Sequence, residues 1–432
     1  MQTTDWASTS REDRKSLLSR PGTTNADDVA PKVREIIAHV RGDGDDALRE
    51  LTRRFDRVNL GELRVTGKEM VEARTALSDT AIDAIDVAIT NVRRFHEQQM
   101  PAPVAVDTMP GVRCERVSRP IDAVGLYVPA GTAPLPSAAV MLAVPAAVAG
   151  CPTRVMCTPP RADGRADPAV VVAAQRAGIE NIYKVGGAQA IAALAYGTAT
   201  IPGVDKIFGP GNAWVTAAKM EVSNDPCGAA IDLPAGPSEV LVIADDDAVP
   251  EFVAADLVSQ AEHGTDSQVV LVTTSRAIAK QSCERIEEQL TSLPRADIAR
   301  AALRHSRIIV VDNCDEAVSV SNEYAPEHLV LHCSNARDLV AGIRNAGSVF
   351  VGKWTPESVG DYCSGTNHVL PTNGYARNYS GLGVDQFMRQ MTVQELTRDG
   401  LAAIGGAVVT LATLEGLEGH AAAVTRRLGA AK

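Results

Sequence analysis

Residues 231–244 have the sequence IDLPAGPSEVLVIA, and residues 250–263 have the sequence PEFVAADLVSQAEH. The first segment places a polar Gly-Pro-Ser turn before an apolar, mostly β-branched run, which predicts a turn leading into a buried strand. The second segment begins with proline and is followed by Gly264, so it predicts a helix over residues 250–263. A strand followed closely by a helix predicts an α/β architecture around this stretch.

The same alternation of strand and helix continues on both sides of this stretch. Further strands are predicted at residues 121–128, 154–158, 181–185, 205–208, 268–273, 306–311, 328–332 and 348–351. Helices between them are predicted at residues 137–150, 168–178, 188–196, 213–223, 277–290, 315–324 and 336–346. Such strict alternation is typical of parallel sheets flanked by helices, so we expect two α/β modules.

The ends of the chain have a different pattern. Residues 1–23 form a short polar arm, and helices are predicted at residues 27–41, 45–55 and 79–98, the first two separated by glycines at 42 and 44. Residues 352–380 are rich in glycine, serine, asparagine and proline, which indicates loops. By periodicity the last ~50 residues are helical, with helices at 393–401 and 407–414.

The composition excludes several classes of protein. A net charge of −11 over 432 residues argues against nucleic acid as the main partner, because phosphate binding requires a basic surface. The sequence has no long apolar run for a membrane span and no basic-then-apolar secretion signal at its start, so we expect a cytoplasmic location. Eight scattered cysteines without a Cys-x-x-Cys pair fit a reducing compartment, and they resemble neither a disulfide framework nor a zinc–cysteine site.

Gln260 and His263 are three residues apart, so their side chains leave the same face of the last turn of a predicted helix. An amide oxygen and an imidazole at this spacing could bind one metal ion. Alternatively, a histidine at a helix C-terminus interacts with the negative end of the helix dipole. The helix alone leaves both interpretations open.

Three glycine-rich segments, at residues 125–131, 186–189 and 209–212, each lie between a predicted strand and a predicted helix. Glycine allows the backbone to approach a ligand, and a helix N-terminus offers free N–H groups to phosphate. None of the segments matches G-x-G-x-x-G, so the usual dinucleotide fingerprint is absent. Ordinary strand-to-helix turns explain these segments equally well.

Other polar residues are candidates for acid–base or metal chemistry. Glu327 and His328 lie at the start of a predicted strand, where they would point to opposite sides. In a loop ahead of the strand both could face one pocket, where histidine could serve as a general base and the carboxylate could activate water. Asp361 is a hard oxygen ligand, and His368 follows it in the same glycine-bracketed segment. His420 is isolated in the C-terminal tail. Each candidate also has a purely structural explanation. Glu327 and His328 could lie in a solvated loop, Asp361 in an Asx turn, and His420 in an exposed tail.

Several of these segments together closely resemble the histidinol dehydrogenase family. The resemblance is carried by residues 231–240 and 256–263, and by GLYVP at 125–129, GGAQAIAALAYG at 186–197, GPGN at 209–212, YAPEHL at 324–329, GDY at 360–362, SGTNHVLPT at 364–372 and MTVQEL at 391–396. The family oxidises L-histidinol to L-histidine through the aldehyde with two NAD⁺, the last step of histidine biosynthesis. Two incomplete Rossmann-like modules with small helical N- and C-terminal arms, in an intertwined homodimer, are the implied architecture.

The resemblance also implies a role for particular residues. One Zn²⁺ would be bound by Gln260, His263, Asp361 and His420, the last from the partner subunit. His328 would act as the general base, and Glu327 would activate water on the aldehyde. Tyr127, Gln189 and Asn212 match NAD positions. The positions that match substrate contacts are Ser238, Gln260, His263, His328, Asp361, His368, Glu415 and His420, with Glu415 also crossing from the partner.

The implied domains are an N-terminal arm at 1–23, a discontinuous catalytic domain at 24–123 and 238–380, an inserted NAD-binding domain at 124–237, and a C-terminal helical arm at 381–432 that reaches the partner subunit. Three alternatives remain open. The chain could be a related zinc- and NAD-dependent dehydrogenase of another polar alcohol, such as a sulfonated diol. Aldehyde oxidation could instead use a thiohemiacetal at Cys114, Cys151 or Cys157, although none of these adjoins a histidine. A non-enzymatic binding protein could also use this fold.

Overall fold

A computed structural model describes residues 1–21, 26–130, 133–233 and 236–429. Gly131 of the first glycine-rich segment, and Pro234 and Ala235 of the central stretch, lie outside the described residues. The chain divides into two compact units, which are described separately below. The first contains Met1–Gln99 and Asp122–Phe387, and the second contains Met100–Ile121 and Met388–Lys432.

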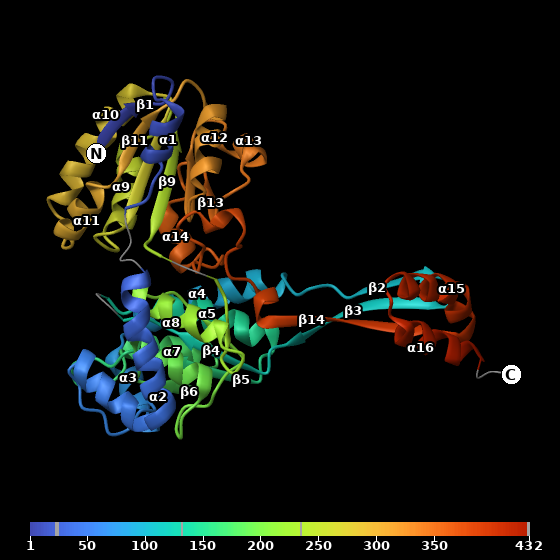
Figure 1. The fold of residues 1–432 in the computed structure, drawn as a ribbon. Helices are drawn as coiled ribbons and strands as arrows, with labels where there is room; N and C mark the ends of the chain where they lie inside the picture. Colours follow the sequence, from blue (N-terminus) through green and yellow to red (C-terminus); the bar gives the residue numbers. More distant parts are fainter. Residues whose placement is uncertain (22–25, 131–132, 234–235, 430–432) are drawn as a thin grey trace. The chain divides into compact units, whose positions relative to one another are not determined.

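A six-stranded parallel sheet forms one part of the first unit (Figure 1). Its strand order is β1 (Gln2–Asp5), β11 (Arg307–Val310), β10 (Gln268–Thr273), β9 (Glu239–Ala244), β12 (His328–His332) and β13 (Ser348–Val351). Helices α9 (Pro250–Ala261), α10 (Arg276–Leu290) and α11 (Ala296–Leu303) cover one face, while α12 (Cys314–Tyr324) and α13 (Ala336–Leu339) cover the other. Because both faces are covered, the central strands are buried at every position, which requires their continuous apolar sequences.

A five-stranded parallel sheet forms the other part of the first unit. Its order is β6 (Asn181–Tyr183), β5 (Thr153–Cys157), β4 (Ala123–Tyr127), β7 (Lys206–Phe208) and β8 (Ala230–Ile231). Helices α7 (Gly187–Tyr196) and α8 (Ala213–Asn224) share a hydrophobic core with α2 (Ala26–Phe55), and α5 (Pro136–Ala149) packs with α6 (Pro168–Arg176) and α4 (Asp79–Glu97). Two parallel sheets confirm the predicted α/β class.

The glycines at 42 and 44 act as predicted within α2. Gly44 has φ 53° and ψ −125°, which are not helical, so α2 consists of two helices meeting at a kink. A positive φ at this position is easily adopted only by glycine. The predicted helices over residues 27–41 and 45–55 correspond to the two halves.

The prediction that the last ~50 residues are helical is wrong for residues 388–396, which include the first part of the helix predicted at 393–401. Met388–Leu396 forms strand β14, which pairs antiparallel with β3 (Val112–Pro120), and β3 pairs with β2 (Val104–Met109). Helices α15 (Arg398–Leu414) and α16 (Glu418–Gly429) follow. Nearly all of β14 is exposed, so its sequence carries no alternation of buried and exposed positions that would reveal a strand.

Smaller differences concern short elements. The N-terminal arm contains strand β1, paired with β11, and helix α1 (Arg11–Leu17). Helix α14 (Glu357–Tyr362) lies in the segment predicted to be loop, α3 (Gly67–Ala76) was not predicted, and the helix predicted at 336–346 ends early in a 3₁₀ turn, Val340–Gly342. The proposed domain boundaries stay a prediction. Across the described part of the chain, no helix is both long and apolar enough to cross a membrane.

Candidate active site

The candidate catalytic residues lie at the N-terminal edge of the six-stranded sheet. His328 is the first residue of β12, Glu327 immediately precedes it, and Ser238 precedes the neighbouring strand β9, on which Val240 is paired with His328. A helix that follows a strand in a parallel sheet runs back along that sheet. The C-terminal end of α9, with Gln260 and His263, therefore returns to the same edge.

The backbone of Glu239 holds both Glu327 and His328. The Glu239 N–H donates to Glu327 Oε2 at 2.8 Å, and His328 Nδ1 lies 3.1 Å from the Glu239 carbonyl oxygen. Because a carbonyl only accepts, Nδ1 carries the hydrogen in the neutral ring, and Nε2 keeps its lone pair. His328 Nε2 is buried and has no hydrogen-bond partner in the described part of the protein, so in the neutral ring this nitrogen could accept a proton from a substrate.

At Glu327 and His328, burial and the neighbouring charges shift the pKa in opposite directions. Burial raises the pKa of Glu327 to about 8 despite the nearby His328 ring. Burial lowers the pKa of His328, but Glu327 and Asp361 outweigh it and raise that pKa to about 10, so the ring favours its protonated form until a cation offsets the charge of Asp361. Glu327 Oε2 lies 3.5 Å from His328 Nδ1, so both side chains face one site, although His328 is the first residue of strand β12 and not part of a loop.

Asp361 approaches the other side of the His328 ring. It lies on α14, with Oδ1 at 3.5 Å from His328 Nε2. Burial raises the pKa of Asp361, but His328 outweighs it and holds this pKa far below its ordinary value. His368 Nδ1 donates to the Asp361 backbone oxygen at 3.0 Å, and burial lowers the pKa of both His368 and His263, so these two rings favour their neutral forms.

Glu357 is a buried residue of the site that the sequence analysis missed. It lies one helical turn before Asp361 on α14, and the backbone N–H of Glu357 donates to Asp256 Oδ1 at 3.3 Å. Its carboxylate accepts hydrogen bonds from the Ser259 hydroxyl at 2.6 Å and from the Gln260 side-chain amide. The i, i+4 spacing of Glu357 and Asp361 was the available signal, but it has meaning only on a helix, and this segment was predicted to be loop.

The residues at this edge fit a zinc ion. Gln260 is fully buried, and its Oε1 has no hydrogen-bond partner in the described residues, because the amide nitrogen of the same side chain faces Glu357. Asp361, a predicted zinc ligand, has a ligand atom within 4.8 Å of one each from His328 and Glu357, which were not predicted to bind zinc. Zinc takes nitrogen and carboxylate oxygen ligands of this kind, and a buried, unpaired amide oxygen gains a partner when a cation binds.

Two further predicted residues belong to the second unit. Glu415 is the C-terminal cap of α15, and His420 lies in the first turn of α16. Both side chains are exposed in the single chain.

The three residues predicted to contact NAD lie near the C-terminal edge of the five-stranded sheet. Tyr127 ends β4, and its hydroxyl oxygen accepts a hydrogen bond from the Gly187 N–H at 3.0 Å. Gln189 is buried in the first turn of α7. Asn212 caps α8, where its Oδ1 accepts from the Trp214 and Val215 N–H groups. Open parallel sheets bind ligands at their C-terminal edge, at the point where the strand order reverses. In this sheet the strands that follow β4 are added first on one side, as β5 and β6, and then on the other side, as β7 and β8.

Backbone contacts bring the glycine-rich segments together. Gly209 has φ +121°, and a Cβ atom there would lie 2.1 Å from the Tyr127 carbonyl oxygen, so only glycine fits. Gly186 is the N-cap of α7 and offers no side-chain oxygen to the N–H groups of the first turn, one of which, that of Gly187, donates to the Tyr127 hydroxyl. These are the features expected of a site for the pyrophosphate of a dinucleotide.

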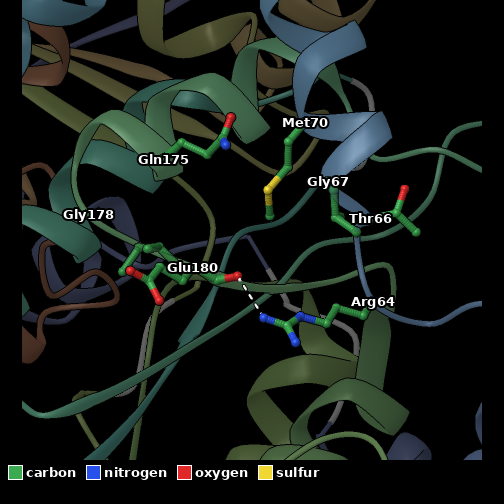
Figure 2. A pocket seen from close by; sticks show the side chains of 9 residues that line it. Arg64, Thr66, Gly67, Met70, Gln175, Gly178 and Glu180 are labelled. Atoms are coloured by element: carbon green, nitrogen blue, oxygen red, sulfur yellow. Dashed lines mark hydrogen bonds between the residues drawn. The ribbon is translucent and has the colours of Figure 1, made fainter.

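A surface hollow of about 530 Å³ lies elsewhere, beside the N-terminus of α3 (Figure 2). Arg64, Met70 and Gln175 line it, and Arg64 donates to the Glu180 carbonyl oxygen at 3.3 Å. None of the predicted site residues lines this hollow.

The cysteines considered for covalent catalysis have unsuitable surroundings. Cys151 and Cys157 are buried in the module of the five-stranded sheet, and burial raises the pKa of the Cys157 thiol far above its ordinary value. Cys114 lies on β3 of the second unit. A nucleophilic cysteine requires a lowered pKa, so burial argues against Cys157 in particular.

Comparison with known proteins gives one consistent result. The family model described as histidinol dehydrogenase matches residues 19–428. Histidinol dehydrogenase of Vibrio cholerae is 54% identical over 428 residues, covering 99% of this chain and 98% of that protein. The Salmonella typhimurium histidinol dehydrogenase is 53% identical with the same coverage. The crystal structure of histidinol dehydrogenase from Elizabethkingia anophelis superposes with a TM-score of 0.96 at 47% identity, covering 100% of this chain and 98% of that one. The chain described here therefore belongs to the histidinol dehydrogenase family.

Proposed function

We propose that this chain oxidises L-histidinol to L-histidine through histidinaldehyde, with one Zn²⁺ per active site and two NAD⁺ per turnover. The observation that best supports this is the buried, unpaired Oε1 of Gln260, together with the unpaired Nε2 of His328 beside Asp361. A metal ligand set and a free base at the same edge of one sheet suit a substrate that must be held and deprotonated. The eight scattered cysteines, none in a Cys-x-x-Cys pair, favour the cytoplasm as the location.

In this proposal Gln260, His263 and Asp361 hold the zinc ion together with the partner's His420. When bound, zinc orients the substrate nitrogen atoms and NAD⁺ accepts hydride. His328 Nε2 takes the hydroxyl proton of histidinol. His328 then releases this proton to solvent, and Glu327 removes a proton from the water that adds to the aldehyde. His328 takes the hydroxyl proton of the resulting hydrate while a second NAD⁺ accepts the hydride. Ser238, His368 and the partner's Glu415 complete the substrate contacts.

The NAD⁺ site in this proposal is the glycine-rich edge carrying Tyr127, Gln189 and Asn212. We further propose that residues 124–237 form the nucleotide module, that residues 24–123 and 238–380 carry the catalytic residues, and that residues 381–432 reach the partner of an intertwined homodimer. The exposed position of Glu415 and His420 supports a role in contacting another subunit.

Product analysis tests the reaction directly. Zinc-loaded protein is incubated with L-histidinol and NAD⁺, and NADH and L-histidine are quantified. We expect two NADH and one L-histidine per histidinol consumed, and no NADH from a sulfonated diol of similar size. Turnover of the diol without turnover of histidinol by fully zinc-loaded protein would overturn the assignment.

A further inference from the structure

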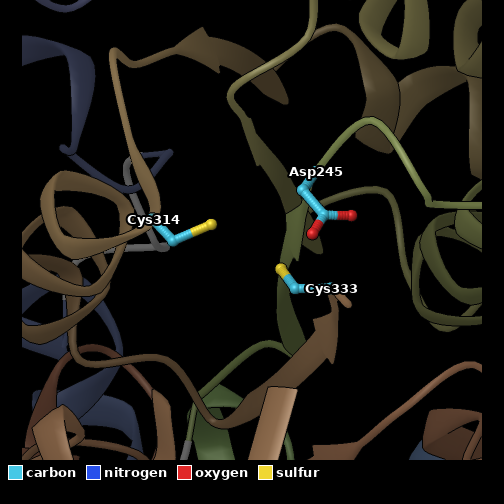
Figure 3. A group of neighbouring side chains, drawn as sticks. All are labelled: Asp245, Cys314 and Cys333. Carbon is cyan, nitrogen blue, oxygen red and sulfur yellow. The ribbon is translucent and has the colours of Figure 1, made fainter. Parts of the chain in front are cut away.

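Asp245, Cys314 and Cys333 form a second group of potential metal ligands (Figure 3). One ligand atom from each residue lies within 4.8 Å of the other two, and all three residues are half-buried. Figure 3 shows the three side chains converging from different segments. In sequence the two cysteines are 19 positions apart, so no short motif announces them.

This group lies at the opposite edge of the six-stranded sheet from His328. Asp245 directly follows β9, Cys333 directly follows β12, and Cys314 begins α12, shortly after β11. Because β12 has five residues at about 3.3 Å each, His328 and Cys333 lie about 16 Å apart. A ligand held by the cysteines would therefore be separate from the proposed active-site zinc.

The position within the sheet favours ligand binding. From β9 the sheet extends through β10 and β11 on one side and through β12 and β13 on the other. Open parallel sheets bind ligands at the C-terminal ends of the strands between which the strand order reverses. Asp245 and Cys333 stand at the ends of the two strands that meet there.

Hydrogen bonds hold the carboxylate of Asp245 in place. Its Oδ2 accepts from the Ser334 N–H at 2.8 Å and from the Ser334 hydroxyl at 2.7 Å, and its Oδ1 accepts from the Asp247 N–H at 3.1 Å. Each carboxylate oxygen can accept more than one hydrogen bond, so both retain acceptor capacity. Within the described ranges of the chain, no lysine, arginine or histidine forms an ion pair with Asp245.

The sulfur atoms are also directed toward a common point. Cys333 Sγ lies 3.5 Å from the Ile243 carbonyl oxygen, and burial raises the pKa of both thiols, so both are neutral at pH 7. Two sulfur ligands of a tetrahedral zinc ion are about 3.8 Å apart, given bonds of about 2.3 Å. Because the ligand atoms lie within 4.8 Å of one another, shifts of up to about 1 Å would close the group around an ion.

We propose that Asp245, Cys314 and Cys333 bind a soft divalent cation of the zinc and cadmium class, with a fourth position open to solvent or an external ligand. Binding replaces two S–H bonds with two sulfur–cation bonds, adds one carboxylate oxygen ligand and releases two protons to solvent. No electron is transferred. Thiolates select zinc or cadmium over magnesium and manganese, which prefer oxygen ligands.

Cadmium binding tests this site, because cadmium thiolates have a characteristic ultraviolet charge-transfer band. Metal-depleted, fully reduced full-length protein is titrated with Cd²⁺, and bound metal is measured by equilibrium dialysis. We expect a second class of Cd²⁺ site in addition to the proposed active site, together with the thiolate band. In C314S/C333S the band and the second ion should be lost, while turnover of histidinol remains unchanged.

Two control variants separate this proposal from the proposed function. C283S changes a half-buried cysteine on α10 and should retain the band and both ions. The double substitution H263A/D361A should lose the active-site ion but retain the thiolate band. Absence of the band in the reduced wild-type protein, or its persistence in C314S/C333S, would overturn the proposal whatever the enzyme does with histidinol.

Discussion

Lys219 and Asp232 form a buried ion pair that holds both sides of Gly209. Lys219 Nζ donates to the Gly209 carbonyl oxygen at 2.9 Å and to Asp232 Oδ1, while Asp232 Oδ2 accepts from the Gly209 N–H at 2.8 Å. The two side chains are 5% and 1% exposed. The pair therefore fixes the glycine turn that we assign to NAD⁺.

Replacing Lys219 with methionine should lower the free energy of unfolding by about 3–5 kcal/mol, because Asp232 would remain buried without a counter-charge. Urea unfolding measures this change. The double variant K219M/D232N removes both charges and should recover part of the loss. Equal losses in the single and double variants would show that the uncompensated charge is not the cause.

Glu357 should determine how tightly zinc binds, because it fixes which end of the Gln260 amide faces the site. In E357Q the new amide can accept from Ser259 or from Gln260 but not from both, so we expect zinc affinity to fall roughly 10–100-fold. Competition with a chromophoric chelator measures this without turnover. The control is E251Q, an exposed change on α9, the helix that carries Gln260. An unchanged zinc affinity in E357Q would contradict the role given to Glu357.

Glu327 and His328 should affect different steps. In E327A, hydride removal from histidinol needs no activated water, so the first NADH should form in a rapid burst. The second NADH should be slowed by roughly 10²–10⁴-fold, the usual contribution of a general base. In H328A both NADH molecules should form slowly. Stopped-flow NADH absorbance separates the two phases, and loss of the burst in E327A would assign Glu327 a different role.

His420 should complement an active site in the other subunit. Protein refolded or co-expressed as an equal mixture of E327A/H328A and H420A chains should regain about a quarter of wild-type activity, because half of the dimers are mixed and each has one intact site. Each variant alone should be inactive. If the mixture stays as inactive as its components, the site is not shared in this way.

His96 should make the protein less stable in acid. Its Nδ1 donates to the Val92 oxygen at 2.8 Å, its Nε2 lies 3.4 Å from Asn367 Nδ2, and burial lowers its pKa. The folded state therefore binds fewer protons than the unfolded chain, so this stabilisation is complete above about pH 6.5 and is lost as pH falls through the lowered pKa. Melting temperatures of wild type and H96Q across this range should converge in acid; parallel curves would exclude His96 as the cause.

The parts of the fold that could be predicted are those whose signals are local. The apolar run at 240–243 predicts a buried parallel strand because both of its faces are covered by helices, which demands apolar residues throughout. Strand β14 could not be found in this way. It is exposed, and its partner β3 precedes it in sequence by more than 250 positions. Neither its burial nor its pairing therefore produces a periodic pattern of apolar residues in the sequence.

The candidate site also contains residues that local sequence spacing could link and residues that it could not. Gln260 and His263 could be paired from their helical spacing, but Asp361 could be joined to them only through the family resemblance, because its segment was predicted to be loop. Glu357 was missed for that reason. The Asp245, Cys314 and Cys333 group depends on three strand ends that meet only in the folded sheet.

The main chain and the side chain of Glu239 serve different parts of the protein. The atoms that hold Glu327 and His328 are its main-chain N–H and C=O, which any residue except proline supplies equally. Mutation at this codon can therefore alter the ion pair between the Glu239 side chain and Arg20 without removing the hydrogen bonds that orient the catalytic pair. The orientation of Glu327 and His328 therefore depends on the β9–β12 register, whereas the Glu239 side chain serves the contacts with Arg20 and the Asn373 N–H.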